Sequence, residues 1–280
     1  MRLETQWLVA GAPVSFGVFE AGAAPLPAGE MVAILAGAGY AGIDLGPPGY
    51  LDLDRLDGLL LAGGWADVPA GDFADLDAVL DLFDRAPAAP AGFEPRPTLG
   101  PPGLPARFAA PGGNAPGLGR ADWPAFAAQV QAAADRCRER GYEPALHHHL
   151  GHAVETTEEI DRLLELTDVG LCLDTGHLLL AGGDPVKALR DWAGRITQVH
   201  VKDGSHRLLA EGGTLRELMG RGVFPPLGAG DLDLPGVLGA LDGYRGWIVV
   251  EQDTLPAHRP TADIAADQAA NLRKLKELGL

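Results

Sequence analysis

Four short apolar runs, each ending in histidine or carboxylate side chains, constrain the fold of this chain more than any other feature of its sequence. The runs cover residues 143–149, 169–177, 196–203 and 247–253. Their end residues His147, Asp174 and His200 follow one another at intervals of 27 and 26 residues, and Glu251 comes 51 residues after His200. A β-strand together with the crossover helix that leads to the next parallel strand takes about 30 residues. The runs are therefore predicted to be successive parallel strands, the last one preceded by an insertion over residues 204–230.

The alternation of side chains along a strand predicts which of these residues share a face. Three pairs do so: His147 with His149, His200 with Lys202, and Glu251 with Asp253. His148 is predicted to point the other way, toward the covering helices. Because an unpaired buried carboxylate is costly, Asp174 is expected either to bind a cation, a set of donors or a metal, or to cap the turn that follows it.

The rest of the chain alternates in the same way between strand-like and helix-like segments. Further strands are expected within residues 7–20, 41–46, 58–63 and 97–100. Helices are expected within 29–38, 72–85, 123–140, 156–166, 185–192, 215–221 and 261–278, and another is expected to begin after its cap Asp233. Up to eight of each in 280 residues predict a single-domain (β/α)8 TIM barrel over residues 1–280, with the carboxyl ends of the strands converging on one mouth. An open doubly wound sheet is the alternative. It would carry a glycine-rich dinucleotide loop after the first strand, which residues 11–17 do not provide.

One segment interrupts the alternation. Residues 87–124 hold ten of the 23 prolines and seven glycines. Proline suits a central strand poorly, so the segment is interpreted either as a linker between domains or, preferably, as a weak strand followed by a long loop over the mouth.

Composition and charge exclude several classes of protein. A hydrophobic content of 46% with 21% charged residues indicates a globular chain. The net charge of −16 argues against nucleic acid as a partner, because such affinity comes from lysine and arginine. The first residues lack a charged leader with an apolar core, and no apolar run approaches the roughly 20 residues of a membrane span. We therefore expect a soluble cytoplasmic protein without a membrane partner, with two unpaired cysteines, and compatible with a homo-oligomer.

The motifs resemble a known family. Residues 169–177 (VGLCLDTGH), 199–203 (VHVKD) and 249–253 (VVEQD) are similar to the xylose isomerase-like barrels, which include sugar isomerases, epimerases and related dehydratases. Residues 10–20, 43–47 and 147–151 are similar more narrowly to the inosose dehydratases, which act on 2-keto-myo-inositol in myo-inositol catabolism. The resemblance covers residues 7–255 and is weakest over 64–120.

The resemblance implies one divalent metal ion, bound at His147, Asp174, His200 and Glu251. Two imidazoles and two carboxylates suit Mn²⁺, Co²⁺, Fe²⁺ or Zn²⁺ better than Ca²⁺. Mn²⁺ or Co²⁺ is favoured, and Mg²⁺ is also compatible. A closed zinc site would be structural, but a position at the barrel mouth favours catalysis. Sugar isomerases and epimerases of the family usually carry Glu where this chain has His147. That change disfavours two-sided proton transfer and favours one-sided abstraction followed by elimination.

The expected chemistry begins with a keto-sugar or keto-cyclitol. The metal chelates its carbonyl oxygen and a neighbouring hydroxyl, and stabilises the enediolate formed when the α-proton leaves. Candidate bases are His149, His177 and Glu251, and candidate acids for the departing β-hydroxyl are His177 and Lys202. Three of these four candidates have a structural alternative: packing for His149, capping for His177, and a salt bridge for Lys202.

Five residues are weaker candidates for substrate binding: Glu20, Asp44, His206, Arg207 and Asp253. Asp253 could instead orient His200, and exposed loop histidines are common without a function. Dehydration of an inosose-like substrate by a metal-dependent lyase is the preferred interpretation, with isomerisation or epimerisation of a sugar or sugar phosphate at the same site as the alternative. A non-catalytic sugar-binding barrel is the alternative from another class. A related DNA-cutting nuclease is disfavoured by the charge.

Overall fold

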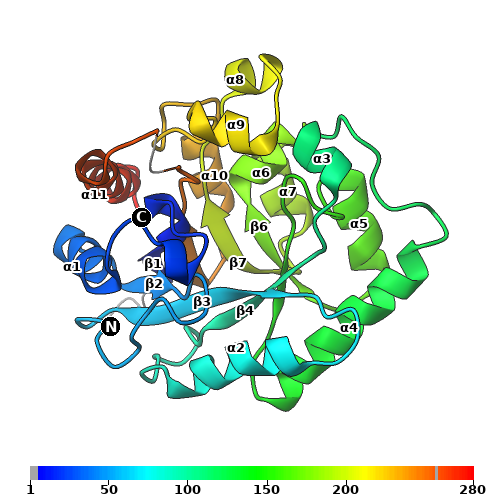
Figure 1. The fold of residues 1–280 in the computed structure, drawn as a ribbon, viewed down its shortest axis with the longest axis horizontal. Coiled ribbons are helices and arrows are strands. Elements are labelled where there is room, and N and C mark those ends of the chain that lie inside the picture. Colours follow the sequence, from blue (N-terminus) through cyan, green and yellow to red (C-terminus); the bar gives the residue numbers. More distant parts are fainter. Residues whose placement is uncertain (1–5, 256–257) are drawn as a thin grey trace.

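Eight parallel strands form a closed barrel in the order β1 to β8 (Figure 1). The computed structural model describes residues 6–255 and 258–280. The strands are β1 (Trp7–Gly11), β2 (Gly42–Asp44), β3 (Leu60–Asp67), β4 (Arg96–Gly100), β5 (Ala145–His147), β6 (Gly170–Asp174), β7 (Ile196–Val201) and β8 (Gly246–Val250). The predicted barrel is confirmed, and the open sheet is excluded because β1 pairs with both β2 and β8.

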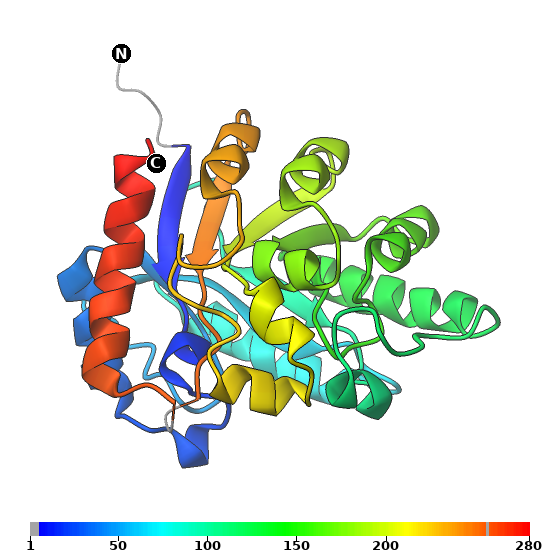
Figure 2. The same cartoon turned by 90° about the horizontal axis from the view of Figure 1, so that it is seen from above.

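Helices cover the outside of the barrel and its mouth. They are α1 (Ala28–Ala38), α2 (Ala74–Arg85), α3 (Pro105–Ala109), α4 (Trp123–Glu139), α5 (Thr157–Leu166), α6 (Thr175–Leu180), α7 (Pro185–Asp191), α8 (His206–Ala210), α9 (Leu215–Gly220), α10 (Leu234–Ala240) and α11 (Thr261–Glu277), with short 3₁₀ turns η1 (Pro13–Phe16) and η2 (Ala21–Ala23). Figure 2 shows α3 and α9 at the end of the barrel toward which the β8 arrow points. None of the described helices has the length and apolarity needed to cross a membrane.

Local signals account for most helix boundaries. The Thr156–Glu159 capping box opens α5, and Asp184 accepts hydrogen bonds from two backbone N–H groups at the start of α7. Asp122, a residue type that often caps helices, directly precedes α4, but its side chain makes no capping hydrogen bond.

Several elements differ from the prediction. Strand β3 extends to Asp67, four residues beyond the predicted end. Between β2 and β3, where no helix was predicted, residues 45–59 form turns that contain Pro47 and Pro48. Helices α6 and α8 were not predicted. The weak fourth strand is confirmed, and the loop that follows it carries α3.

The barrel interior is filled in layers, as the alternation of side chains along the strands requires. Trp247 of β8 occupies the end away from the mouth, and its indole N–H donates to the Phe93 carbonyl at 2.8 Å. Gly42 makes room for it, since a Cβ there would lie 2.7 Å from the ring. Gln198 of β7 is fully buried. Two residues further along β7 the chain reaches His200, so the apolar interior ends where the polar site begins.

Candidate functional site

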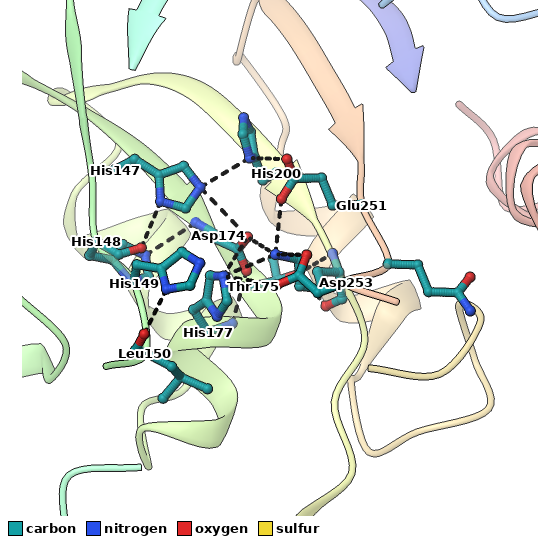
Figure 3. Close-up of polar contacts among 12 residues, drawn as sticks. His147, His148, His149, Leu150, Asp174, Thr175, His177, His200, Glu251 and Asp253 are labelled. Carbon is teal, nitrogen blue, oxygen red and sulfur yellow. Dashed lines mark hydrogen bonds and ion pairs between the residues drawn. The ribbon is translucent and has the colours of Figure 1, made fainter. Parts of the chain in front are cut away.

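The four residues predicted as metal ligands converge at the mouth (Figure 3). His147 ends β5, Asp174 ends β6, His200 lies in β7 and Glu251 follows β8. All four are buried, and one donor atom from each lies within 4.8 Å of the others. Parallel strands with a common direction explain the convergence, because their carboxyl ends meet at one end of the barrel.

Hydrogen bonds define which ring nitrogen of His147 carries the lone pair that could bind a metal. Its Nδ1–H donates to the backbone carbonyl of His148 at 2.8 Å, so Nε2 carries the lone pair. That Nε2 lies 3.1 Å from Nδ1 of His200 and 3.8 Å from Asp174 Oδ2. Nδ1 of His200 in turn lies 3.2 Å from Glu251 Oε1. Two imidazoles and two carboxylates facing one point are the donor chemistry of a divalent transition-metal site, so the residues fit such an ion.

The charge state of His200 depends on its surroundings. Burial lowers the pKa of its imidazole, but the Cys172 sulfur and the Glu251 carboxylate outweigh burial and raise the pKa well above its ordinary value. For His147, burial and the neighbouring His200 both lower the pKa. Of the two imidazoles, His200 is therefore the one that more readily carries the extra proton, and it does so next to the Glu251 carboxylate.

Lys202 lies at the centre of the site's negative charge. Its Nζ is 3.1 Å from Asp174 Oδ2, 2.9 Å from Glu251 Oε2 and 2.8 Å from Asp253 Oδ1. The residue is 1% exposed. Burial alone lowers the pKa of an ammonium, yet the three carboxylates raise the pKa of Lys202 well above its ordinary value. Lys202 is therefore a buried cation held by salt bridges, which is the structural role that the sequence left open for it.

Asp174 combines the two roles that the sequence left open. Its Oδ1 accepts the backbone N–H of His177 at 2.8 Å and so caps α6. Its Oδ2 faces Lys202 and the Nε2 of His147. The cap positions the carboxylate, because α6 begins directly at the end of β6. His148 points away from the mouth as predicted, and its Nε2 accepts the Asp174 backbone N–H at 3.1 Å.

The rings of the other two candidate histidines lie against one another, with an angle of 43° between their planes. The ring centroids of His149 and His177 are 3.7 Å apart. His149 lines the cavity, and its Nδ1–H donates to the Leu150 carbonyl at 2.6 Å, so its Nε2 bears the lone pair. His177 lies behind it, with Nε2 3.0 Å from Lys202 Nζ. Burial lowers the pKa of both imidazoles well below the ordinary value, which keeps both rings neutral.

The site opens into a cavity of about 480 Å³. Its floor is polar. Its rim contains apolar and aromatic side chains that the sequence did not connect with the site: Phe19, Trp65 of β3, Phe108 of α3, and Leu215 and Met219 of α9. Arg216 of α9 also lines it. Trp65 packs edge-on against His147 and His149. Its position near the end of β3 was the one signal in the sequence that could have identified it.

The proline-rich segment does reach the mouth. Phe108 of α3 lines the cavity, and α3 is tethered to α5 by buried Arg107, whose guanidinium binds Glu159 at 2.6 and 2.8 Å. Glu155 accepts backbone N–H groups of Gly112 and Gly113. The segment therefore forms part of the cavity rim and is held there by these hydrogen bonds. This agrees with the preferred interpretation of residues 87–124 as a strand followed by a long loop over the mouth.

Of the five weaker substrate-binding candidates, the structure brings two to the cavity. Asp44 and Asp253 line it. Glu20 is exposed beside η2, outside the cavity lining. His206 and Arg207 begin α8, are exposed, and do not line it either; Arg207 pairs with Glu211 one helical turn on. The insertion reaches the mouth with α9 instead, because Leu215, Leu218 and Met219 pack inward.

Comparisons with known proteins agree with this geometry. The family model described as "Xylose isomerase-like TIM barrel" matches residues 74–275. The chain belongs to this family.

Curated relatives of this xylose isomerase-like barrel match over about half of their own length. They include the rhizopine catabolism protein MocC of Rhizobium meliloti, 42% identical over 153 residues (51% of this chain and 47% of the relative). Inosose dehydratase of Geobacillus kaustophilus is 41% identical over 145 residues (49% of this chain and 47% of the relative). A crystal structure of the IOLI protein with a zinc atom superposes with a TM-score of 0.65 at 14% identity, covering 97% of each chain, which is a likeness of fold.

Proposed function

We propose that the chain is a divalent-metal-dependent dehydratase, a lyase that removes water from a keto-cyclitol of the inosose type. The observation that carries the proposal is the group of four buried donors, His147, Asp174, His200 and Glu251, beside a cavity-lining imidazole, His149, whose Nε2 lone pair is free. Relatives named inosose dehydratases support the substrate class.

The metal's identity follows from donor chemistry. Two nitrogens and two carboxylates support Mn²⁺ or Co²⁺, with Zn²⁺, Fe²⁺ or Mg²⁺ as alternatives, over an ion that prefers all-oxygen shells. When bound, the ion would polarise the keto group of the substrate and acidify the neighbouring C–H.

The chain's own residues supply the proton transfer and the binding surface. His149 is neutral and accepts the α-proton on Nε2, while the Leu150 carbonyl holds its ring through Nδ1. His177 stacks behind His149 and restricts its rotation. Lys202 offsets part of the negative charge of Asp174, Glu251 and Asp253. A cavity of about 480 Å³ accommodates a small cyclic substrate.

Isomerisation or epimerisation would use the same α-proton abstraction. The family's epimerases usually carry Glu at the position of His147. In this chain, Nε2 of His147 faces the other candidate metal ligand His200, so the residue is not placed to exchange a proton with the substrate. That arrangement favours elimination over return of the proton to the opposite face.

The test has two parts. Elemental analysis of purified protein should find about one divalent ion per chain, and the ion should be lost in Asp174→Asn and His200→Ala but kept in the control Asp191→Asn, an exposed carboxylate on α7. The Mn²⁺ or Co²⁺ form should then exchange the α-proton of 2-keto-myo-inositol with D₂O and release water, followed by NMR. Absence of both metal binding and exchange would contradict the proposal and favour a sugar-binding barrel.

A further inference from the structure

Elimination needs an acid for the departing hydroxyl, and the titratable residues that line the cavity can be considered one by one. His147, His200 and Glu251 form the candidate metal site. Lys202 is held by three carboxylates that strengthen its hold on its proton. The predicted acid His177 does not line the cavity. Each of these residues is therefore occupied or out of reach.

Two further residues of the cavity wall are also unsuited to the role. Asp253 Oδ1 pairs with Lys202 at 2.8 Å, and its Oδ2 lies 3.6 Å from His177 Nε2. His152 is held through Nδ1 by the Leu150 carbonyl, and burial lowers the pKa of its ring, so it is neutral. Asp44 remains.

Asp44 combines burial, an unsatisfied oxygen and a fixed position. It ends β2, lines the cavity and is 7% exposed. Its Oδ1 accepts the Gly46 backbone N–H at 3.1 Å, whereas its buried Oδ2 makes no hydrogen bond with any described residue. Leaving a buried carboxyl oxygen unsatisfied is costly, so its retention in a cavity points to a ligand group that completes it.

The loop after Asp44 holds the carboxyl in place. Gly46 has a positive φ of 61°, and a Cβ at this position would lie 2.6 Å from the Pro13 ring. Only glycine combines this left-handed conformation with such close packing. The hydrogen bond from Gly46 therefore fixes one carboxyl oxygen and directs the other.

Asp44 and His149 lie on different sides of the mouth. In the closed order β1 to β8, strand β2 is separated from β5 by two strands on one side and four on the other. A small substrate in the cavity is thus placed between an imidazole that takes a proton and a carboxyl group. A base for the α-proton and a separate acid for the leaving hydroxyl are the two groups that general acid–base catalysis of an elimination uses.

We propose that Asp44 is the general acid that protonates the departing hydroxyl, an assignment that rests on the proposed dehydratase function. His149 Nε2 takes the α-proton, the C–H electron pair becomes the new C=C bond, and the C–O bond to the β-hydroxyl breaks. The Asp44 carboxyl proton passes to that oxygen, so water leaves. Asp44 then regains a proton as His149 loses one to solvent, and no oxidant or reductant is consumed.

The environment of Asp44 increases the share of its carboxyl group that is protonated before the reaction. Burial, with a smaller effect of the Glu251 charge, raises the pKa of Asp44 to about 6, against the opposing effects of His200 and the Gly46 N–H. A carboxyl with a pKa closer to neutrality can both hold and release a proton at working pH. The alternative role for Asp44 is that of an ionised carboxylate that accepts a hydrogen bond from a substrate hydroxyl and transfers no proton.

Asp44→Asn separates the two roles, because an amide keeps an acceptor for Gly46 but cannot release a proton. Asp54→Asn is the matched control: the same substitution at an exposed carboxylate of the same connection. Four quantities are measured for each Mn²⁺-loaded protein: bound metal, binding of 2-keto-myo-inositol by calorimetry, α-proton exchange with D₂O, and dehydration. Asp44→Glu tests whether a displaced carboxyl restores part of the activity.

If Asp44 is the acid, Asp44→Asn lowers dehydration by about 100-fold or more, while exchange and substrate affinity change by less than about threefold. Asp44→Glu recovers part of the dehydration, and Asp54→Asn matches the wild type. Equal losses of affinity, exchange and dehydration would instead assign Asp44 to hydroxyl binding and overturn the inference, as would unchanged dehydration. A wild-type protein that neither exchanges nor dehydrates overturns the proposed function itself, and the role of Asp44 with it.

Discussion

Replacing Lys202 by methionine should destabilise the metal-free protein more than any exposed lysine substitution. Methionine has nearly the same length but no charge, so Asp174, Glu251 and Asp253 lose the cation that lies 2.8 to 3.1 Å from each. Removing one partner of a buried ion pair costs about 3–5 kcal/mol. With three carboxylates affected and some relief from protonation, we expect a loss of about 4 kcal/mol in the free energy of unfolding at pH 7.

The assay is urea unfolding of metal-free protein, with Lys187→Met as control. Lys187 is exposed and pairs with Asp191 on α7, so its substitution should change the free energy of unfolding by less than about 1 kcal/mol. In the Lys202→Met variant the carboxyl pKa values rise above their unfolded values, so the lost stability should shrink as pH falls and the groups protonate. Saturating Mn²⁺ should also recover part of the loss, because the ion supplies positive charge to the same carboxylates.

A loss below about 1 kcal/mol at pH 7 would refute this reasoning. It would mean that the three carboxylates do not depend on Lys202 for their neutralisation. A loss that grows at lower pH would refute it equally, because protonation would then fail to compensate for the missing cation.

Three further perturbations test other parts of the structure. Because the pKa of His200 is raised, Mn²⁺ binding at pH 7 should release about one proton, detected as a dependence of the calorimetric enthalpy on the buffer; no such dependence would contradict the assignment. Asp203→Asn should lose about 2–4 kcal/mol of unfolding free energy, since the carboxylate accepts four backbone N–H groups; Asp242→Asn, at an exposed position, should lose none. Arg107→Met should speed hydrogen exchange in residues 101–122, since the bidentate pair with Glu159 is lost, while exchange in α4 stays constant; equal exchange in both proteins would show that the tether is dispensable.

Sequence patterns predicted the barrel and the residues at its mouth because both depend on local properties. Alternation along a strand placed His147, His200 and Glu251 on inner faces, and the regular interval between strands indicated their order. Those arguments need only the direction of a side chain and the end of a strand. The convergence of these residues therefore followed from the fold class alone.

Contacts between distant segments were not predictable in this way. The Lys202 network joins β6, β7 and the residues after β8, and its distances depend on how far each side chain reaches inside the barrel. Helix α3 lies in a proline-rich stretch without periodicity, so nothing in the sequence placed Phe108 in the cavity. His206 and Arg207 were attractive by residue type, but the packing of α9 rather than α8 decides which side chains reach the mouth.

The carboxylate of Asp203 connects the insertion to the barrel through backbone contacts. Changes in the insertion can therefore accumulate separately from changes in the barrel strands. The two carboxylate oxygens accept N–H groups of Gly204, Gly228, Gly230 and Leu232, which bracket the segment that carries α8 and α9. These four bonds are made to backbone, so they place no demand on the side chains between them. The residues of α9 that line the cavity can therefore diverge, or be grafted from a related barrel as a cassette, while the strand that carries His200 and Lys202 keeps its position. Selectivity at the rim and chemistry at the floor can change independently in this architecture.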